Sequence, residues 1–249
     1  RLENLDINNI LLSIGDFDPY SNNEPFTQYD DDLRGKILQI NKNNGNYKIL
    51  SKGNRNPQGL FYEKNNNIIF STDHGPRGGD EINIQKLEEN KVENFGWPIS
   101  SYGKHYSIDD LNKISIFQTK LKKDNEKKMN LKYEKQPLLK SHKENGFTEP
   151  IKYWENPNFP PTQIISLYDS VNKHYNLYLS SLGNSGELHK SLIHLKFNKE
   201  FKLIKSYNIK INQRIRDLDY LKKNNTLIMY LEESSSIAFL KLKNNYDIK

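Results

Sequence analysis

The hydrophobic positions of this chain fall into short runs in which aromatic and β-branched side chains alternate with polar ones. Each run ends at a cluster of Asn, Gly, Asp or Lys, which is typical of strands joined by turns. In the clearest pair, residues 59–62 turn through three asparagines into residues 68–71. Only residues 108–114 carry a weak helical period. The pattern therefore predicts a mostly antiparallel all-β protein, with strands at 10–14, 35–40, 47–51, 59–62, 68–71, 81–84, 165–168, 175–179, 192–197, 201–209, 217–220, 227–231 and 237–242.

Hairpins that recur along the whole chain favour a β-propeller, in which four-stranded blades repeat around an axis. A β-sandwich shows the same alternation and turn spacing, so the pattern alone leaves both architectures open. We expect a single domain over residues 1–249, a partial propeller. A Lys-rich, apolar-poor stretch at about 104–148 interrupts the strand pattern, and we interpret it as a long inserted loop. A solvated or partly disordered excursion is favoured over the alternative, a functional lid.

The composition narrows the possible partners. The net charge is +6, but the lysines are scattered among Asn and Ile, which is typical of a compositional bias and not of a nucleic-acid patch. Charge alone leaves polyanion binding by residues 104–143 open. The absence of cysteine excludes disulfides, thiolate metal ligands and a cysteine nucleophile. No apolar run approaches the ~20 residues of a membrane span.

Two polar clusters lie near predicted strand ends in the first part of the chain. Asp16 follows a strand and Gly15; its carboxylate can orient a histidine or bind a cation, or else start a turn. The loop 53–59 contains Arg55 and Asn56 among further amides. A guanidinium offers a fixed fork of donors for a carboxylate or a developing oxyanion, so this loop suits a ligand with several oxygens. A loop held only by its own hydrogen bonds remains an equal alternative.

Two further clusters indicate a cation and an anion. Residues 73–81 combine Gly75 and Pro76, which expose backbone carbonyls, with nearby carboxylates, and hard cations such as Ca²⁺ favour that combination. The acidic spacing of an EF-hand loop is missing. Arg214 and Arg216 lie two positions apart in a predicted strand, so their side chains share a face. They can converge on one anionic ligand or pair with local carboxylates.

Six signatures, in this order, resemble the glucose/sorbosone dehydrogenase family of soluble quinoproteins, whose bacterial aldose sugar dehydrogenase branch consists of six-bladed propellers. The resemblance covers nearly the whole chain and is weakest at 104–148. It implies a six-bladed β-propeller of which this chain supplies about four blades. The signatures are Ile14-Gly15-Asp16, Arg34-Gly35-Lys36-Ile37-Leu38, Arg55-Asn56-Pro57-Gln58-Gly59-Leu60, His74-Gly75-Pro76 with Gly79-Asp80-Glu81, Asn94-Phe95-Gly96-Trp97-Pro98, and Arg214-Ile215-Arg216-Asp217.

The resemblance implies roles for the first two clusters. Asp16 resembles the carboxylate that orients the catalytic histidine and keeps it basic. Arg55 resembles the arginine beside the reactive carbonyl of pyrroloquinoline quinone (PQQ), where it stabilises negative charge as hydride arrives. Asn56 is implied to contact the same cofactor.

The other two clusters are implied to hold the cofactors as well. Gly75 and Pro76 resemble the pair whose backbone carbonyls bind Ca²⁺, and Arg214 and Arg216 resemble the arginines that bind the carboxylates of the quinone. The family often has a cofactor-binding basic residue after the strand that ends at residue 182. Here a Gly-rich segment follows, and Lys190 is the candidate to replace that residue.

The resemblance implies a periplasmic or secreted enzyme that oxidises the hydroxyl or hemiacetal carbon of an aldose and passes electrons to a separate acceptor. The sequence carries no signal for the sugar, the acceptor or the oligomeric state. A non-catalytic propeller that works as a binding module is the alternative, since fold does not fix function.

The catalytic base of the family is a histidine a few residues before the segment that Arg1-Leu2 resembles. We therefore expect this chain, which opens with Arg1, to lack its natural start and to be inactive alone. None of the histidines in the chain stands at the position of the base: His74, His105, His142, His174, His189 and His194.

Overall fold

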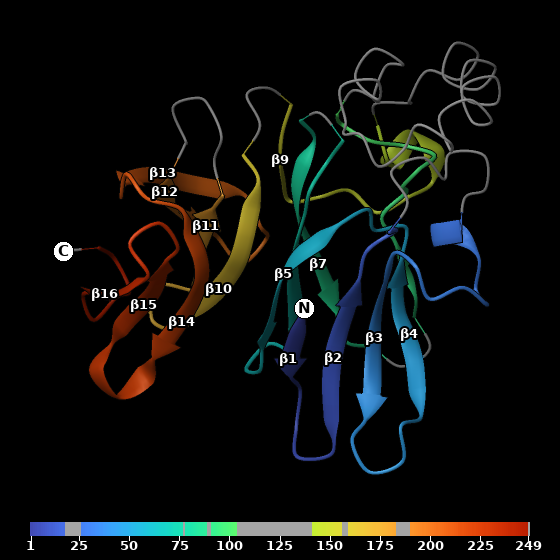
Figure 1. Cartoon of the computed structure of the whole chain (residues 1–249), viewed down its shortest axis with the longest axis horizontal. Helices are drawn as coiled ribbons and strands as arrows, with labels where there is room; N and C mark the ends of the chain where they lie inside the picture. The colour runs from blue at the N-terminus through green and yellow to red at the C-terminus, as the bar shows by residue number, and fades with distance from the viewer. Residues whose placement is uncertain are drawn as a thin grey trace.

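The computed structural model describes residues 1–17, 26–76, 78–88, 91–103, 141–155, 159–182 and 190–248. The strands within these residues form four sheets (Figure 1). Short 3-10 helices are the only helices in the described ranges: Phe26–Gln28, Lys143–Asn145 and Lys222–Asn224. None of these helices has the length or the apolar character to cross a membrane.

The first two sheets are built from the N-terminal half of the chain. The first sheet contains the antiparallel strands β1 (Leu2–Asn4), β2 (Asn9–Ile14), β3 (Lys36–Asn41) and β4 (Tyr47–Lys52), with β8 (Glu93–Asn94) added to β4 in parallel. The second sheet contains the antiparallel strands β5 (Pro57–Glu63), β6 (Ile68–Asp73), β7 (Asp80–Lys86) and β9 (Lys152–Trp154).

The remaining two sheets follow in chain order and are also antiparallel meanders. The third sheet contains β10 (Pro161–Asp169), β11 (His174–Ser181), β12 (Ser191–Phe197) and β13 (Leu203–Lys210). The fourth sheet contains β14 (Ile215–Leu221), β15 (Thr226–Leu231) and β16 (Ser236–Lys241).

Consecutive sheets pack through their first strands. β1 and β2 contact β5, β5 contacts β10, and β10 contacts β14. The three hydrophobic cores lie between successive sheets: one contains Leu11 and Leu60, the next Phe70 and Leu177, and the third Tyr178 and Leu227. Four separate meanders with cores between them are blades of a propeller and not the two facing sheets of a sandwich.

Burial along single strands follows from this packing. All six residues of β6 are buried, because both faces of the second sheet are covered by neighbouring sheets. In β16 half-buried and exposed positions alternate instead, and Ile237 and Phe239 are 61% and 64% exposed. The fourth sheet therefore has one covered and one open face within the described residues.

The prediction of an all-β propeller with about four blades is confirmed, and every predicted strand is present within a few residues. The start of β10 was placed too late because it begins with Pro161 and two polar residues and shifts register before Ile164. The predicted single domain with an insertion stays an interpretation. Residues 104–140, including the weak helical period at 108–114, lie outside the described residues.

Candidate active site

The candidate site lies at the edge where β2 and β6 end and β5 begins. Asp16 follows β2, Arg55 precedes β5 and His74 follows β6. Because β5 and β6 are antiparallel neighbours, the start of one and the end of the other reach the same edge. The Asp16 N–H donates to the Arg55 carbonyl at 2.7 Å, and the His74 N–H donates to the Asn56 carbonyl at 3.2 Å. Three segments distant in sequence thus meet through their backbones.

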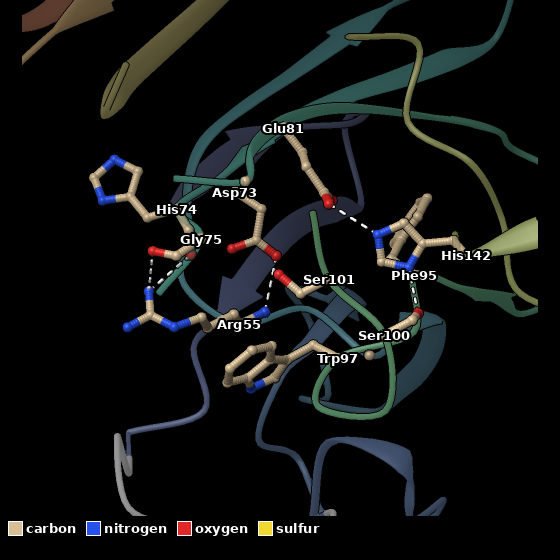
Figure 2. A pocket seen from close by; sticks show the side chains of 12 residues that line it. Arg55, Asp73, His74, Gly75, Glu81, Phe95, Trp97, Ser100, Ser101 and His142 are labelled. Carbon is tan, nitrogen blue, oxygen red and sulfur yellow. Dashed lines mark hydrogen bonds and ion pairs between the residues drawn. The ribbon is translucent and has the colours of Figure 1, made fainter. Parts of the chain in front are cut away.

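The Arg55 side chain lies against two backbone carbonyls and an aromatic ring (Figure 2). Its Nη1 donates to the carbonyl oxygens of His74 at 2.7 Å and Gly75 at 3.0 Å. Its guanidinium carbon lies 5.5 Å from the centroid of the Trp97 ring. The planar, delocalised guanidinium can make both kinds of contact at once, which a lysine ammonium does less well. The position of Arg55 is therefore set by the loop after β6.

The buried carboxylate of Asp73 fixes the backbone on which Arg55 stands. It accepts hydrogen bonds from the backbone N–H groups of Arg55 at 2.8 Å and Asn56 at 2.5 Å. Burial, and secondarily the negative charge of Glu81, raises the pKa of Asp73 to about 7. The carboxylate thus replaces water as the acceptor for two N–H groups that no strand pairing satisfies.

A second carboxylate, Asp80 at the start of β7, fixes the loop that carries Gly75. It accepts from the Gly75 N–H at 3.1 Å and from the Phe159 N–H at 2.9 Å. Burial raises the pKa of Asp80 to about 6. Because Phe159 lies just before β10, this carboxylate also ties the second sheet to the third.

In the loop between β6 and β7, main-chain atoms pack directly against one another. A Cβ at Gly75 would collide with the Gly78 carbonyl, and a Cβ at Gly79 would collide with the Gly103 N–H. Gly79 also has φ +72°, in the left-handed region that favours glycine. The loop can keep this shape only without side chains at these positions.

Asp16 is held by the indole of Trp97. Its side chain is buried, and the Trp97 Nε1–H donates to its Oδ2 at 2.9 Å. The Trp97 backbone is fixed in turn, since its N–H donates to the Gly53 carbonyl at 2.9 Å and its carbonyl accepts from Gln28 Nε2 at 2.7 Å. Trp97 therefore lies between Asp16 and Arg55 and contacts both.

His74 links this cluster to the third sheet. Its Nε2 lies 2.5 Å from the Pro161 carbonyl, which can only accept, so Nε2 carries the proton. Burial lowers the pKa of His74 to about 4. One residue further, Thr162 Oγ1 donates to the Ile215 carbonyl at 2.9 Å. The starts of β5, β10 and β14 therefore lie at one end of the sheets.

The predicted anion-binding pair flanks the first residue of β14. The Arg214 Nε donates to the Leu182 carbonyl at 3.1 Å and lies 3.7 Å from Glu232 Oε2, while Arg216 Nη1 lies 4.0 Å from the same oxygen. Lys190 pairs nearby, with Glu233 at 2.7 Å. The two arginines stand at the same end as the Arg55 cluster, at the start of the fourth sheet, and Lys190 directly precedes β12 of the third.

The structure thus brings together Asp16, Arg55, Asn56 and Gly75, with the buried Pro76 beside them, and places Arg214 and Arg216 two sheets further along. The described residues contain no group of three His, Asp or Glu side chains that could hold a metal. Oxygen ligands other than side chains are nevertheless close, because the His74 and Gly75 carbonyls converge on Arg55.

Sequence reasoning treated Asp73 and Glu81 only as carboxylates near a cation site and gave no role to Trp97 or His142, yet all four line the same pocket (Figure 2). The sequence does carry a signal for three of them. Asp73 ends a buried strand, Glu81 lies near the start of the next strand, and Trp97 belongs to the signature at residues 94–98. His142 carried no signal, since it lies in the Lys-rich stretch. In the structure it is 1% exposed.

The sequence is similar to proteins of one known family. Residues 5–128, about half of the chain, match the model of the Glucose / Sorbosone dehydrogenase family. An aldose sugar dehydrogenase of Escherichia coli, YliI, is 36% identical over 111 residues, which cover 39% of this chain and 28% of that protein. An uncharacterized protein of Synechocystis is 26% identical over 241 residues, which cover 88% of this chain and 49% of that protein.

Solved structures show the same fold. The apo form of the soluble aldose sugar dehydrogenase of Escherichia coli matches with a TM-score of 0.60 at 25% identity, covering 96% of this chain and 62% of that one. A glucose dehydrogenase matches with a TM-score of 0.61 at 21% identity, covering 93% and 60%. The chain therefore spans less than two thirds of each of these proteins.

Proposed function

Because the chain belongs to the glucose/sorbosone dehydrogenase family, we propose that its whole protein oxidises the hydroxyl or hemiacetal carbon of an aldose, with PQQ and Ca²⁺ as cofactors. One observation carries the proposal: Asp16, Arg55, Asn56 and the Gly75 carbonyl form a single hydrogen-bonded cluster at one end of the sheets. A separate electron acceptor and a periplasmic or secreted location are part of the same proposal.

The chemistry of the donors around Arg55 suits both cofactors. The Gly75 and Pro76 backbone carbonyls are proposed to bind Ca²⁺, since carbonyl oxygens are among the hard ligands that it prefers. The buried carboxylates of Asp73 and Asp80 add negative charge close by. When bound, the quinone supplies a carbonyl that accepts hydride, and Ca²⁺ polarises it.

The residues of this chain would then act as follows. Arg55 stabilises the negative charge that develops beside it, because the His74 carbonyl and the Trp97 ring already orient its guanidinium. Asn56 contacts the same ligand. Asp16, fixed by the Trp97 indole, orients the general base and keeps it basic.

The general base is proposed to be a histidine other than the two in this pocket. His142 uses both ring nitrogens, one toward Ser100 and one toward Glu81. His74 donates to the Pro161 carbonyl. His142 therefore has no ring nitrogen left for a sugar hydroxyl, and burial lowers the pKa of His74 to about 4, which makes it a weak base.

Arg214 and Arg216 are proposed to bind the carboxylates of the quinone. Both are at present close to one carboxylate, Glu232, and bidentate recognition of carboxylates is the usual role of arginine. Binding would exchange one carboxylate partner for another, and the net charge of the cluster would favour it because Lys190 lies close by.

The test is reconstitution of the whole protein with PQQ and Ca²⁺, followed by quinone uptake and by dye reduction with a panel of aldoses. Uptake with reduction by at least one aldose is the expected result. Uptake without reduction by any sugar would overturn the enzyme and support a non-catalytic binding module. Failure to take up the quinone at millimolar Ca²⁺ would overturn the cofactor assignment as well.

A further inference from the structure

A buried chain of three polar side chains lies behind the Arg55 cluster. Glu81 is at the start of β7, Ser100 follows the loop that carries Trp97, and His142 precedes the 3-10 helix at 143–145. His142 Nε2 lies 2.9 Å from Glu81 Oε1, and His142 Nδ1 lies 2.5 Å from Ser100 Oγ (Figure 2). The three residues are 1–6% exposed, so these hydrogen bonds are made away from solvent.

The chemistry of the partners fixes the direction of the hydrogen bonds. A carboxylate only accepts, so Glu81 holds the proton of His142 on Nε2. In the neutral ring Nδ1 then accepts, and Ser100 donates its hydroxyl proton to it. Ser100 is thereby held in one rotamer, and a buried network in which every member is satisfied specifies one geometry.

Aromatic packing holds the imidazole plane itself. The Tyr102 ring stands edge-on to His142, with ring centroids 5.1 Å apart, and stacks on Tyr153 of β9 at 3.7 Å. The Tyr102 hydroxyl donates to Glu149 Oε2 at 2.5 Å. His142 therefore has no freedom to turn away from either partner.

The network ends on the turn that carries Trp97. The Ser100 N–H donates to the Gly96 carbonyl at 3.0 Å. A Cβ at Gly96, which has φ +86°, would collide with Ser100 Oγ and His142 Nδ1. The turn 96–100 is therefore folded directly onto the histidine, and Trp97 is its second residue. The Trp97 indole in turn donates to Asp16.

We propose that His142 is a positioning residue: together with Glu81 and Ser100 it holds the turn 96–100, and through Trp97 it sets the position of Asp16. This inference rests on the proposed function for the importance of Asp16, but the geometry is independent of any cofactor. The proposal thereby gives a role to the segment that begins at residue 141, since His142 of this segment lines the pocket.

The test uses the indole N–H signals of the ¹⁵N-labelled chain. The chain has two tryptophans, Trp97 and Trp154, and Trp154→Phe assigns the signals. Ser100→Ala is expected to shift the Trp97 signal and to speed its hydrogen exchange about tenfold, while the Trp154 signal stays in place. Ser101→Ala is the matched control: Ser101 is equally buried, but its Oγ accepts from Gly103 N–H, outside the network, so both signals should stay.

Two substitutions of His142 separate the effects of its hydrogen bonds to Glu81 and Ser100. His142→Gln carries a donor that reaches Glu81 but no group at the Nδ1 position, so it should reproduce Ser100→Ala. His142→Asn keeps a group near Nδ1 and should leave Trp97 closer to its original signal. An unchanged Trp97 signal in both Ser100→Ala and His142→Gln, or equal changes at both tryptophans, would overturn the proposal.

A kinetic measurement on the whole, reconstituted protein separates this inference from the proposed function. Ser100→Ala should lower kcat about tenfold with KM unchanged, since the sugar and quinone contacts are kept. If the Trp97 signal responds as expected but no form of the protein oxidises an aldose, the positioning network stands and the enzyme assignment fails.

Discussion

The loop around Arg55 and the start of β14 carry arginines for the same proposed ligand, but only the first stands on a backbone that a buried carboxylate fixes. Asp73, 5% exposed, accepts two backbone N–H groups beneath Arg55. At β14, Arg214 and Arg216 lie 3.7 and 4.0 Å from Glu232, whose side chain is 36% exposed. Hydrogen bonds to a charged group contribute about 1.5–3 kcal/mol each, and an exposed ion pair at most about 1 kcal/mol.

The difference indicates a division of labour. Beside the reacting carbonyl, donors must be aligned before the reaction, because reorganisation would add to its barrier. Groups that only bind the far carboxylates of a ligand can close on it afterwards. The buried carboxylates around Arg55 provide the first property, and the loose pairing with Glu232 leaves room for the second.

The largest expected effect comes from replacing one arginine at each of the two sites. Arg55→Gln in the whole protein should lower kcat/KM for aldose oxidation about 10²- to 10³-fold, the usual cost of one pre-aligned donor at a developing oxyanion. Arg216→Gln should cost less than about tenfold, because Arg214 and Lys190 remain. Dye-reduction kinetics measure both. Equal losses would show that the two sites do not differ as proposed.

The carboxylates that contact the two arginine sites, Asp73 and Glu232, should contribute differently to the free energy of unfolding. Asp73→Asn leaves one oxygen for two backbone N–H groups and turns an amide N–H toward one of them, so it should lower the free energy of unfolding by about 2–3 kcal/mol. Glu232→Gln should change it by less than about 1 kcal/mol. Urea denaturation of both variants, with unchanged m-values, measures the difference, and a Glu232 effect as large as that of Asp73 would contradict the comparison.

A pair of tryptophan substitutions tests the indole contact alone. Trp97→Phe keeps an aromatic ring beside Arg55 but removes the donor to Asp16, and should lower the free energy of unfolding by about 1–2 kcal/mol. Trp154→Phe keeps the packing on Phe159 and should cost less than about 1 kcal/mol. Thermal and urea unfolding of the two variants give the comparison; the reverse order would mean that the indole N–H contributes nothing.

The smallest effect concerns β1, next to which Arg1 forms an ion pair with Asp217 of β14. Burial raises the pKa of Glu3 to about 7. Between pH 4.5 and 7 the folded chain therefore binds more protons here than the unfolded chain, so stability contributed by Glu3 is lost as the pH rises through this window. Glu3→Gln should flatten that part of the stability profile. Parallel profiles of the two chains would refute the assignment.

The strands could be predicted because the blades contain short runs of apolar residues, such as residues 68–70 of β6 and 227–229 of β15, and because Asn and Gly mark the turns. The first residues of β10 could not. The residues there are Pro161, Thr162 and Gln163, which are buried because their polar groups form hydrogen bonds to other sheets. Their local pattern is therefore not that of a buried apolar strand.

Within the candidate site, Asp16, Arg55, Asn56 and Gly75 could be placed together only through the resemblance, since each cluster alone left a structural alternative open. The contact of Trp97 with Asp16 spans 81 positions, and that of His142 with Glu81 spans 61. Such pairings are set by the packing of whole blades, and no local spacing encodes them.

The bare-backbone contact among Gly75, Gly78, Gly79 and Gly103 restricts how this corner can be redesigned. If these codons were randomised in a library, we expect glycine to be recovered at 75, 79 and 103, since any added methyl group meets a main-chain atom that cannot yield. New ligand preferences would then have to arise from substitutions on the rim. Directed evolution of this protein would best begin around β14, where the half-buried Arg214 and the exposed Arg216 leave space for change.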